Sequence, residues 1–312
     1  YTITLDVGGT SIKAALIKHI FTDGIQFQLV EQSYKTYSSK SSEDCETIIN
    51  NLVTIIKDQY HLIEDNDFLI SSISFGFPGP FDYNNATSFM QGIDKFDSIY
   101  NMNLEKELQK KLTTLHLAKL SADITIVFEN DATLFALGEY HISNLKKYSR
   151  IIFITLGTGC GSTFLAEGKI VKGAFGVPQN GMIFDVSFRD GIIDNYISRR
   201  YILSLAKDAS FDITKVDVKD LMEFAQSGDK NAIQIFARFG TILGKALYSF
   251  IKSFQADAIL FGGQISKAYP LFQSSFENEI LPMQPKIIRS QNLSKSALIG
   301  AAVYAQNVNK VQ

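Results

Sequence analysis

Two turns rich in glycine and threonine carry the clearest chemistry in this sequence. Gly8-Gly9-Thr10 joins two apolar segments near the start of the chain, and Gly157-Thr158-Gly159 joins two more in its second half. Such a turn exposes backbone N–H groups and a hydroxyl, and glycine lets a phosphate approach without a Cβ in the way. The repetition predicts two similar domains that hold one polyphosphate, although the second turn could also be an ordinary glycine-rich hairpin.

Two charged residues flank the first turn. Asp6 ends the strand before it, and Lys13 lies in the strand after it. A carboxylate at the end of a strand could simply cap the turn, or it could bind the Mg²⁺ that accompanies phosphates. Lys13 favours the second interpretation, because it adds a positive charge for the same anion.

Asn130 and Asp131 stand where an apolar strand (124–128) meets a predicted helix (132–141). Either residue could serve as the N-cap of that helix. A carboxylate at this position could also act as a general base, taking the proton from a substrate hydroxyl as it attacks a γ-phosphate. The two roles are compatible within one pair, and both remain open.

Two other segments end apolar strands with glycine. Pro78-Gly79-Pro80 follows a buried strand and forms either a rigid binding loop or only a turn. Gly262-Gly263 follows the strand 258–261 and forms either a simple turn or a surface on which a nucleotide base could lie. Glycine permits both interpretations, because it allows close backbone approach as well as tight turns.

The order of predicted elements is the same in both halves of the chain. Strands come first and helices follow, which predicts an α/β protein with two related domains. The elements on which this rests are strands over 2–7, 11–18, 25–37, 151–155 and 161–166, and an amphipathic helix over 231–254. A helix of small residues over 296–306 is predicted to pack tightly against the first domain.

Composition excludes several classes of protein. The chain has 312 residues, of which 46% are hydrophobic and 20% charged, and a net charge of −2. That length is enough for two domains with separate cores, and the small charge predicts neither a nucleic-acid nor a membrane partner. No apolar run is long enough to span a membrane. Cys45 and Cys160 are too few for a metal cluster, and a reducing cytoplasmic location is expected.

Taken together and in this order, the segments resemble the ROK family of sugar kinases and sugar-responsive repressors, within the actin-like ATPase superfamily. The matching segments are LDVGGTSIKAALI, FGFPGPFD, FENDATLFALGE, FITLGTGCGSTFLAEGKIVKG, FGGQIS and ALIGAAVYA. The resemblance covers nearly the whole chain. It implies two actin-like (ribonuclease H-like) domains with a cleft between them: residues 1–121 plus 297–312, and residues 122–296.

The resemblance also implies a role for each motif residue. Asp131 would be the general base toward the 6-hydroxyl of a sugar, and Asn130, Pro78 and Gly79 would contact the sugar itself. Asp6 would lie at the magnesium. The remaining residues would bind ATP: Asp6, Gly8, Gly9, Thr10 and Lys13 at the phosphates and magnesium, Gly157, Thr158 and Gly159 at the transferring phosphate, and Gly262 and Gly263 under the nucleoside.

The chain departs from the family pattern between residues 173 and 194. Family members usually have a Gly-Glu-x-Gly-His stretch there, whereas this chain reads GAFGVPQNGMIF, with neither an acid nor a histidine. Gln179 or Asn180 would replace the sugar-binding glutamate, and Asp194 would replace a later one. Since the cysteine-rich loop of the family is also missing, no zinc site is expected. An amide in place of an acid weakens hydrogen bonds that are worth about 1.5–3 kcal/mol.

The resulting prediction is an ATP- and Mg²⁺-dependent sugar kinase, with glucose or an N-acetylmannosamine-like hexose as the acceptor. By family analogy we expect a homodimer. The repressors of the family carry a winged helix-turn-helix, for which this chain leaves no room, so no DNA partner is expected. The weakened sugar motif leaves a sugar-sensing protein with little kinase activity as the alternative. A different actin-like ATPase is a third interpretation, which the Asn130-Asp131 pair disfavours.

Overall fold

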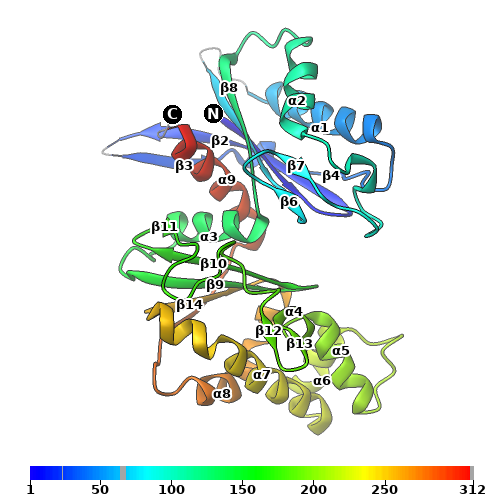
Figure 1. Cartoon of the computed structure of the whole chain (residues 1–312), viewed down its shortest axis with the longest axis vertical. Helices are drawn as coiled ribbons and strands as arrows, with labels where there is room; N and C mark the ends of the chain where they lie inside the picture. Colours follow the sequence, from blue (N-terminus) through cyan, green and yellow to red (C-terminus); the bar gives the residue numbers. More distant parts are fainter. Residues whose placement is uncertain (23, 64–67, 310–312) are drawn as a thin grey trace. The chain divides into compact units, whose positions relative to one another are not determined.

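The computed structural model describes residues 1–22, 24–63 and 68–309, which form two compact units (Figure 1). The first unit is Tyr1–Asn144 with Ser294–Gln312, and the second is Leu145–Leu293. The boundary expected between residues 121 and 122 lies inside the strand Leu120–Glu129, which belongs to the first unit. The first unit continues through the next helix, Asp131–Ile142, and the second unit begins at Leu145. Residues 310–312 of the expected closing segment lie outside the described residues.

The first unit is built on a six-stranded sheet in the order β3-β2-β1-β5-β8, with β4 also paired to β2. β1 runs antiparallel to β2 and parallel to β5, which is parallel to β8. The strands are β1 (Thr2–Val7), β2 (Ser11–Phe21), β3 (Ile25–Leu29), β4 (Lys35–Ser38), β5 (Ile70–Gly76), β6 (Phe81–Asp82), β7 (Thr87–Ser88) and β8 (Leu120–Glu129). The helices are η1 (Glu31–Ser33), α1 (Cys45–Tyr60), η2 (Asp97–Ile99), α2 (Leu104–Thr113), α3 (Asp131–Ile142) and α9 (Leu293–Asn309).

Alternation along β2 explains why helices cover both faces of this sheet. Side chains of successive strand residues point to opposite faces. Ile12, Ala14 and Leu16 belong to the core that includes α1 and α2, whereas Ala15 and Ile17 pack with apolar residues of α9. The small-residue helix therefore packs on the first unit, as predicted.

The predicted strand over 25–37 is wrong, because the chain turns in its middle. The Ser33 hydroxyl donates to the carbonyl of Val30 at 2.6 Å and accepts the N–H of Leu16 at 2.8 Å. These bonds replace ladder bonds with a short 3₁₀ helix, η1, so that β3 and β4 are separate strands that both pair with β2.

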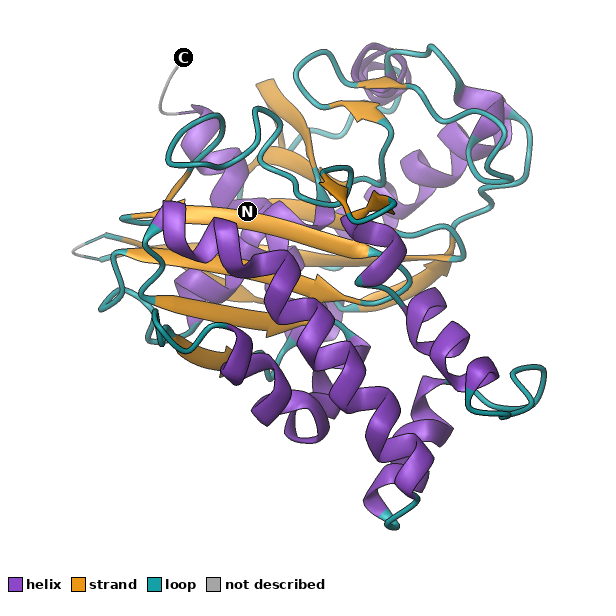
Figure 2. Ribbon diagram, turned by 60° about the horizontal axis from the view of Figure 1, so that its bottom comes forward, coloured by secondary structure: helices purple, strands orange, loops and turns teal. Residues whose placement is uncertain are grey.

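The second unit repeats the pattern with a five-stranded sheet in the order β11-β10-β9-β14-β15. An antiparallel hairpin, β9 and β10, is followed by β14 and β15 parallel to β9. The strands are β9 (Arg150–Leu156), β10 (Cys160–Ala166), β11 (Lys169–Ile170), β12 (Ser187–Phe188), β13 (Gly191–Ile192), β14 (Ala258–Gly262) and β15 (Lys286–Arg289). The helices are α4 (Ile193–Tyr196), α5 (Arg199–Asp208), α6 (Val218–Gln226), α7 (Lys230–Phe254), η3 (Gln264–Ala268) and α8 (Tyr269–Glu279). Figure 2 separates the strands from the helices by colour.

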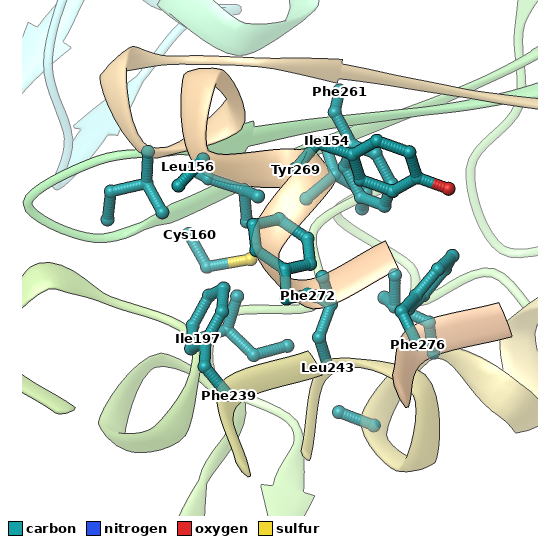
Figure 3. Packing of buried hydrophobic residues seen from close by; sticks show 14 of the residues in the cluster. Ile154, Leu156, Cys160, Ile197, Phe239, Leu243, Phe261, Tyr269, Phe272 and Phe276 are labelled. Carbon is teal, nitrogen blue, oxygen red and sulfur yellow. The ribbon is translucent and has the colours of Figure 1, made fainter. Parts of the chain in front are cut away.

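The core of the second unit lies between its sheet and the helices α7 and α8. Phe239 and Leu243 of α7 meet Phe272 of α8, and Ile154 of β9 belongs to the same buried cluster (Figure 3). The predicted apolar stripe of the long helix is buried throughout. The Asp229 side chain caps the start of this helix by accepting the N–H of Ala232 at 2.8 Å.

Helices α3 and α9 of the first unit cross with their backbones almost in contact. A Cβ on Gly138 would lie 1.7 Å from the carbonyl oxygen of Ser296, and a Cβ on Gly300 would lie 1.7 Å from that of Leu134. Only glycine fits at either position. The Ser296 hydroxyl also donates to the buried carboxylate of Glu139 at 2.5 Å, which fixes the crossing.

Membrane insertion is not indicated by the helices. Within the described ranges, no helix combines the length and the apolar composition that crossing a bilayer requires.

Candidate functional site

The carboxyl ends of three parallel strands bring the motifs of the first unit together. In the sheet, Asp6 at the end of β1 pairs with Gly76 of β5, and Gly76 pairs with Glu129 of β8. The segment with Pro78 and Gly79 leaves β5 at this edge. Helix α3 begins here as well, so the strand register alone places the three motifs side by side.

The first glycine turn joins β1 to β2 and leaves two donors unused. The N–H of Gly8 donates to the carbonyl of Ser11 at 2.9 Å and closes the turn. In the described part of the chain, no acceptor lies within hydrogen-bonding distance of the N–H groups of Gly9 and Thr10. Two unpaired N–H groups on adjacent residues can bind an anion.

Asp6 and Lys13 occupy paired positions on the two strands of this hairpin. The Lys13 Nζ lies 3.8 Å from Asp6 Oδ2, and the Asp6 side chain is 22% exposed. The structure therefore brings together Asp6, the turn and Lys13, as the sequence predicted.

A second carboxylate, Asp131, acts on Asp6 electrostatically. Burial raises the pKa of Asp6 to about 6, the charge of Asp131 adds to this, and Lys13 opposes it. Desolvation by the surrounding protein also raises the pKa of Asp131, and the hydrogen bond that its carboxylate accepts from the N–H of Ala132 opposes this rise. Two neighbouring carboxylates whose charged forms are both disfavoured are a suitable environment for a divalent cation or for a general base.

The pKa of Asp6 predicts how stability depends on pH. Between about pH 4 and pH 6 the folded chain keeps a proton that the unfolded chain has lost, so the contribution of Asp6 to the free energy of unfolding falls as pH rises. The loss is at most about 3 kcal/mol. We expect Asp6→Asn to be as stable as the wild type at pH 4 and more stable at pH 8.

Urea unfolding at both pH values measures this difference. Asp58→Asn, on an exposed position of α1, is the matched control and should show no such dependence. A stability difference between Asp6→Asn and wild type that is the same at both pH values would contradict the prediction.

Asn130 is the N-cap of α3, which confirms one of the two interpretations of the pair. Its Oδ1 accepts the N–H of Ala132 at 3.0 Å, and Oδ1 of Asp131 accepts the same N–H at 2.8 Å. Among the described residues, no other residue donates a hydrogen bond to Oδ2 of Asp131. The carboxylate is therefore held in place by one oxygen and can accept a proton through the other.

Two residues that sequence reasoning missed support Asn130. The buried Glu129 carboxylate accepts the N–H of Asn130 at 2.8 Å, and it also bonds the hydroxyl of Tyr304, whose pKa is raised by burial and by that carboxylate. The Tyr83 hydroxyl accepts a hydrogen bond from Nδ2 of Asn130 at 3.3 Å and donates one to the carbonyl of Phe77 at 3.0 Å. Tyr83 thus links the Pro-Gly loop to the start of α3.

Removing this link is expected to cost stability. Tyr83→Phe deletes both hydrogen bonds and should lower the free energy of unfolding by about 1 kcal/mol, since a partly buried carbonyl loses its donor. Tyr100→Phe removes an exposed hydroxyl and is the matched control. Equal stability of the two variants in urea unfolding would show that the bridge does not stabilise the fold.

The second glycine turn joins β9 to β10 in the second unit. The N–H of Gly157 donates to the carbonyl of Gly159 at 3.1 Å. As in the first turn, the next two N–H groups, of Thr158 and Gly159, have no acceptor among the residues described. The two turns therefore expose equivalent pairs of donors.

Gly262 and Gly263 lie at the same edge of this second sheet. Gly262 pairs with Thr155 of β9, and a Cβ on Gly263 would lie 2.1 Å from the carbonyl oxygen of Leu156. Gly263 also has a φ of 82°, which favours glycine. This close approach places the pair directly beside the residue that precedes the turn.

Asp194 contacts the second turn through one of its carboxylate oxygens. Its Oδ1 accepts the N–H of Cys160 at 2.7 Å, and a Cβ on Gly159 would lie 2.7 Å from the same oxygen. Its Oδ2 lies 2.5 Å from the guanidinium of Arg200. Sequence reasoning expected Asp194 at the sugar and did not single out Arg200, because nothing in the local pattern links them.

Gln179 and Asn180 lie on an exposed turn of the second unit. The Gln179 amide lies against Gly173, and Oδ1 of Asn180 accepts the N–H of Met182 at 2.9 Å. Within the described ranges, neither side chain forms a hydrogen bond or an ion pair with the 157–159 turn or with Asp194. A role for these two residues at the sugar stays a prediction.

The described residues offer few groups that could bind a metal ion. Across residues 1–22, 24–63 and 68–309, no group of three or more histidine, cysteine, aspartate or glutamate side chains is arranged to hold a metal ion. Asp6 is the side chain that fits a magnesium ion held mainly by phosphates, because Mg²⁺ commonly takes one or two carboxylates and otherwise water and phosphate oxygens. The expectation of no zinc site stays a prediction.

Comparison with known proteins identifies relatives along the whole chain. The model of the ROK family matches residues 2–308. A glucokinase of Thermotoga maritima is 24% identical, covering 95% of this chain and 92% of the relative. A xylose repressor of Bacillus spizizenii is 22% identical over 96% and 73%, and an N-acetyl-D-glucosamine kinase of Pectobacterium carotovorum is 23% identical over 82% and 87%.

Solved structures share the fold. A ROK hexokinase from Thermus thermophilus superposes with a TM-score of 0.77 at 19% identity, covering 100% of this chain and 99% of the other. A ROK family glucokinase from Streptomyces griseus, solved with glucose and AMPPNP, gives 0.72 at 20% identity over 98% and 99%. The chain therefore has the two-domain actin-like ATPase fold that its sequence predicted.

Proposed function

The chain belongs to the ROK family, and we propose that it is a sugar kinase that transfers the γ-phosphate of ATP to the 6-hydroxyl of a hexose. The acceptor would be glucose or an N-acetylmannosamine-like sugar. One observation carries the proposal: the Asp131 carboxylate stands at the start of α3 with one oxygen held by Ala132 and a raised pKa. A relative named as a glucokinase, matched over 95% of this chain, and one named as an N-acetyl-D-glucosamine kinase, matched over 82%, support it.

Asp131 acts as the general base in this proposal. A raised pKa makes a carboxylate a stronger proton acceptor, and a base is most effective when its pKa is near the working pH. Asp131 takes the proton from the sugar hydroxyl as its oxygen attacks the γ-phosphorus and the bond to ADP breaks. Asn130 and the loop with Pro78 and Gly79 orient the sugar, and Tyr83 keeps these two segments in register.

The two turns bind phosphate oxygens with their unpaired N–H groups, and Lys13 adds a positive charge to the first turn. Donors that are already oriented stabilise charge on the phosphoryl group without reorganising during the reaction. A magnesium ion, which Asp6 would help to hold, neutralises phosphate charge when bound. Gly262 and Gly263 would lie under the nucleoside.

The stretch from 173 to 194 bears on sugar preference. Gln179 and Asn180 would supply amides where the family has a glutamate. Both oxygens of Asp194 already bond protein groups, but a carboxylate oxygen can accept more than one hydrogen bond, so a sugar hydroxyl can share it. These replacements would change the preferred sugar more than the phosphoryl transfer.

The same stretch favours a second candidate, a sugar-sensing protein with little kinase activity. Its support is the absence of an acid and a histidine from residues 173–184, together with a relative named as a xylose repressor. Sugar-dependent binding without ADP formation is the behaviour that distinguishes it.

The test is ADP release from Mg-ATP across a panel of hexoses, amino sugars and glucosides. ADP formation with one sugar and not with buffer would establish the kinase and name its acceptor. A folded, ATP-binding protein that releases no ADP with any sugar would overturn the kinase proposal and favour the sensor. ATP hydrolysis at the same rate with every sugar would point to a different ATPase.

A further inference from the structure

The side chain of Lys95 lies directly over the first glycine turn. A Cβ on Gly9 would be 2.4 Å from its Cδ, 2.7 Å from its Cε and 2.9 Å from its Nζ. Gly9 thus leaves room for a lysine stem that runs across the turn and ends in an ammonium group. The neighbouring N–H groups of Gly9 and Thr10 are those without acceptors in the described part of the chain.

Buried contacts of the residue that follows Lys95 support this placement. Phe96, the next residue, is fully buried, and its ring lies 5.3 Å from that of Phe77. The N–H of Phe96 donates to the carbonyl of Ser41 at 2.6 Å, and the Ser41 hydroxyl donates to the carbonyl of Gly9 at 2.5 Å. The segment that carries Lys95 is therefore tied to the turn that Lys95 covers.

The ammonium group of Lys95 differs from that of Lys13 in its charged neighbours. Lys13 on the same hairpin has Asp6 at 3.8 Å, whereas no carboxylate among the described residues lies within ion-pair distance of the Lys95 ammonium. An exposed lysine normally extends into water to keep its freedom. A cation and two unpaired N–H groups at one glycine together make a site for an anion.

We propose that Lys95 binds a phosphoryl group of the nucleotide at the turn 8–10. The inference deepens the proposed function, on which it rests for the identity of the ligand. Lys95 contacts the substrate through its ammonium, and the N–H groups of Gly9 and Thr10 hold the same phosphoryl group from the backbone. Phe96 acts as a positioning residue that keeps the lysine over the turn.

Titration calorimetry of the full chain with Mg-ATP and with adenosine tests this inference. Lys95→Met keeps most of the stem and removes the charge, so it should weaken Mg-ATP binding at least about tenfold, as expected for a hydrogen bond to a charged group. Adenosine, which has no phosphate, should bind both forms equally. Lys95→Arg should regain most of the affinity, and Lys110→Met, an exposed lysine of α2, should bind like the wild type.

Each of the other possible calorimetry results either retains or overturns the role of Lys95. Unchanged or tighter Mg-ATP binding by Lys95→Met overturns the inference, as does an equal loss for ATP and adenosine, which would indicate a merely structural role. A wild type that binds Mg-ATP but phosphorylates no sugar, with Lys95→Met weakened, leaves the inference standing and overturns only the kinase proposal. A wild type that binds no ATP overturns both.

Discussion

Asp131→Asn is expected to lower kcat for sugar phosphorylation by about 10²- to 10⁴-fold, the usual contribution of a general base. The amide oxygen can still accept the N–H of Ala132, so the start of α3 should keep its geometry. The amide cannot take up the proton of a sugar hydroxyl. We therefore expect the KM for the sugar and the affinity for Mg-ATP to stay close to the wild-type values.

Steady-state kinetics on the best sugar of the panel, with calorimetry for ATP, separates chemistry from binding. Asp58→Asn makes the same chemical change on an exposed face of α1 and should leave kcat unaltered. A variant at Asp131 that keeps wild-type kcat would exclude this residue as the base. A loss that is confined to KM would assign it to sugar binding only.

Gly300→Ala is expected to lower the free energy of unfolding by about 3 kcal/mol. Alanine is the better helix former by about 1 kcal/mol, so propensity alone predicts a gain. The new Cβ would lie 1.7 Å from the carbonyl oxygen of Leu134, however, and backbone atoms cannot move aside as a flexible side chain can. The helices must separate, and the steric cost exceeds the propensity gain.

Urea denaturation measures this cost, with Gly24→Ala as control, because a Cβ on Gly24 would meet no atom within 4 Å. Since α3 also begins with Asp131, separating α3 from α9 should lower kcat as well. A Gly300→Ala variant as stable as the control would show that the crossing is looser than described.

Much of the site could be predicted from sequence, because its motifs are local. A glycine turn between two apolar strands and an Asn-Asp pair between a strand and a helix are readable within a few residues. The strand register then brings Asp6 and Asp131 into one site, which parallel strands with motifs at their carboxyl ends would suggest.

The residues that sequence reasoning missed act across long separations. Tyr83 meets Asn130, and Lys95 meets Gly9, through the path of a loop that has no regular pattern. The predicted strand 25–37 is divided into β3 and β4 because the Ser33 hydroxyl accepts the N–H of Leu16, which belongs to another strand. Side chains that satisfy distant backbone groups leave no periodic signal along the chain.

The pairing of Asp6 with Gly76, and of Gly76 with Glu129, limits where related chains can gain or lose residues without disturbing this site. Inserting one residue within β1, β5 or β8 would turn every following side chain of that strand to the opposite face. Insertions in the loops that leave these strands would not disturb the pairing. New acceptor preferences should therefore arise by exchanging loops, whereas Asp6 and the start of α3, with the proposed base Asp131, are inherited as one unit with the sheet.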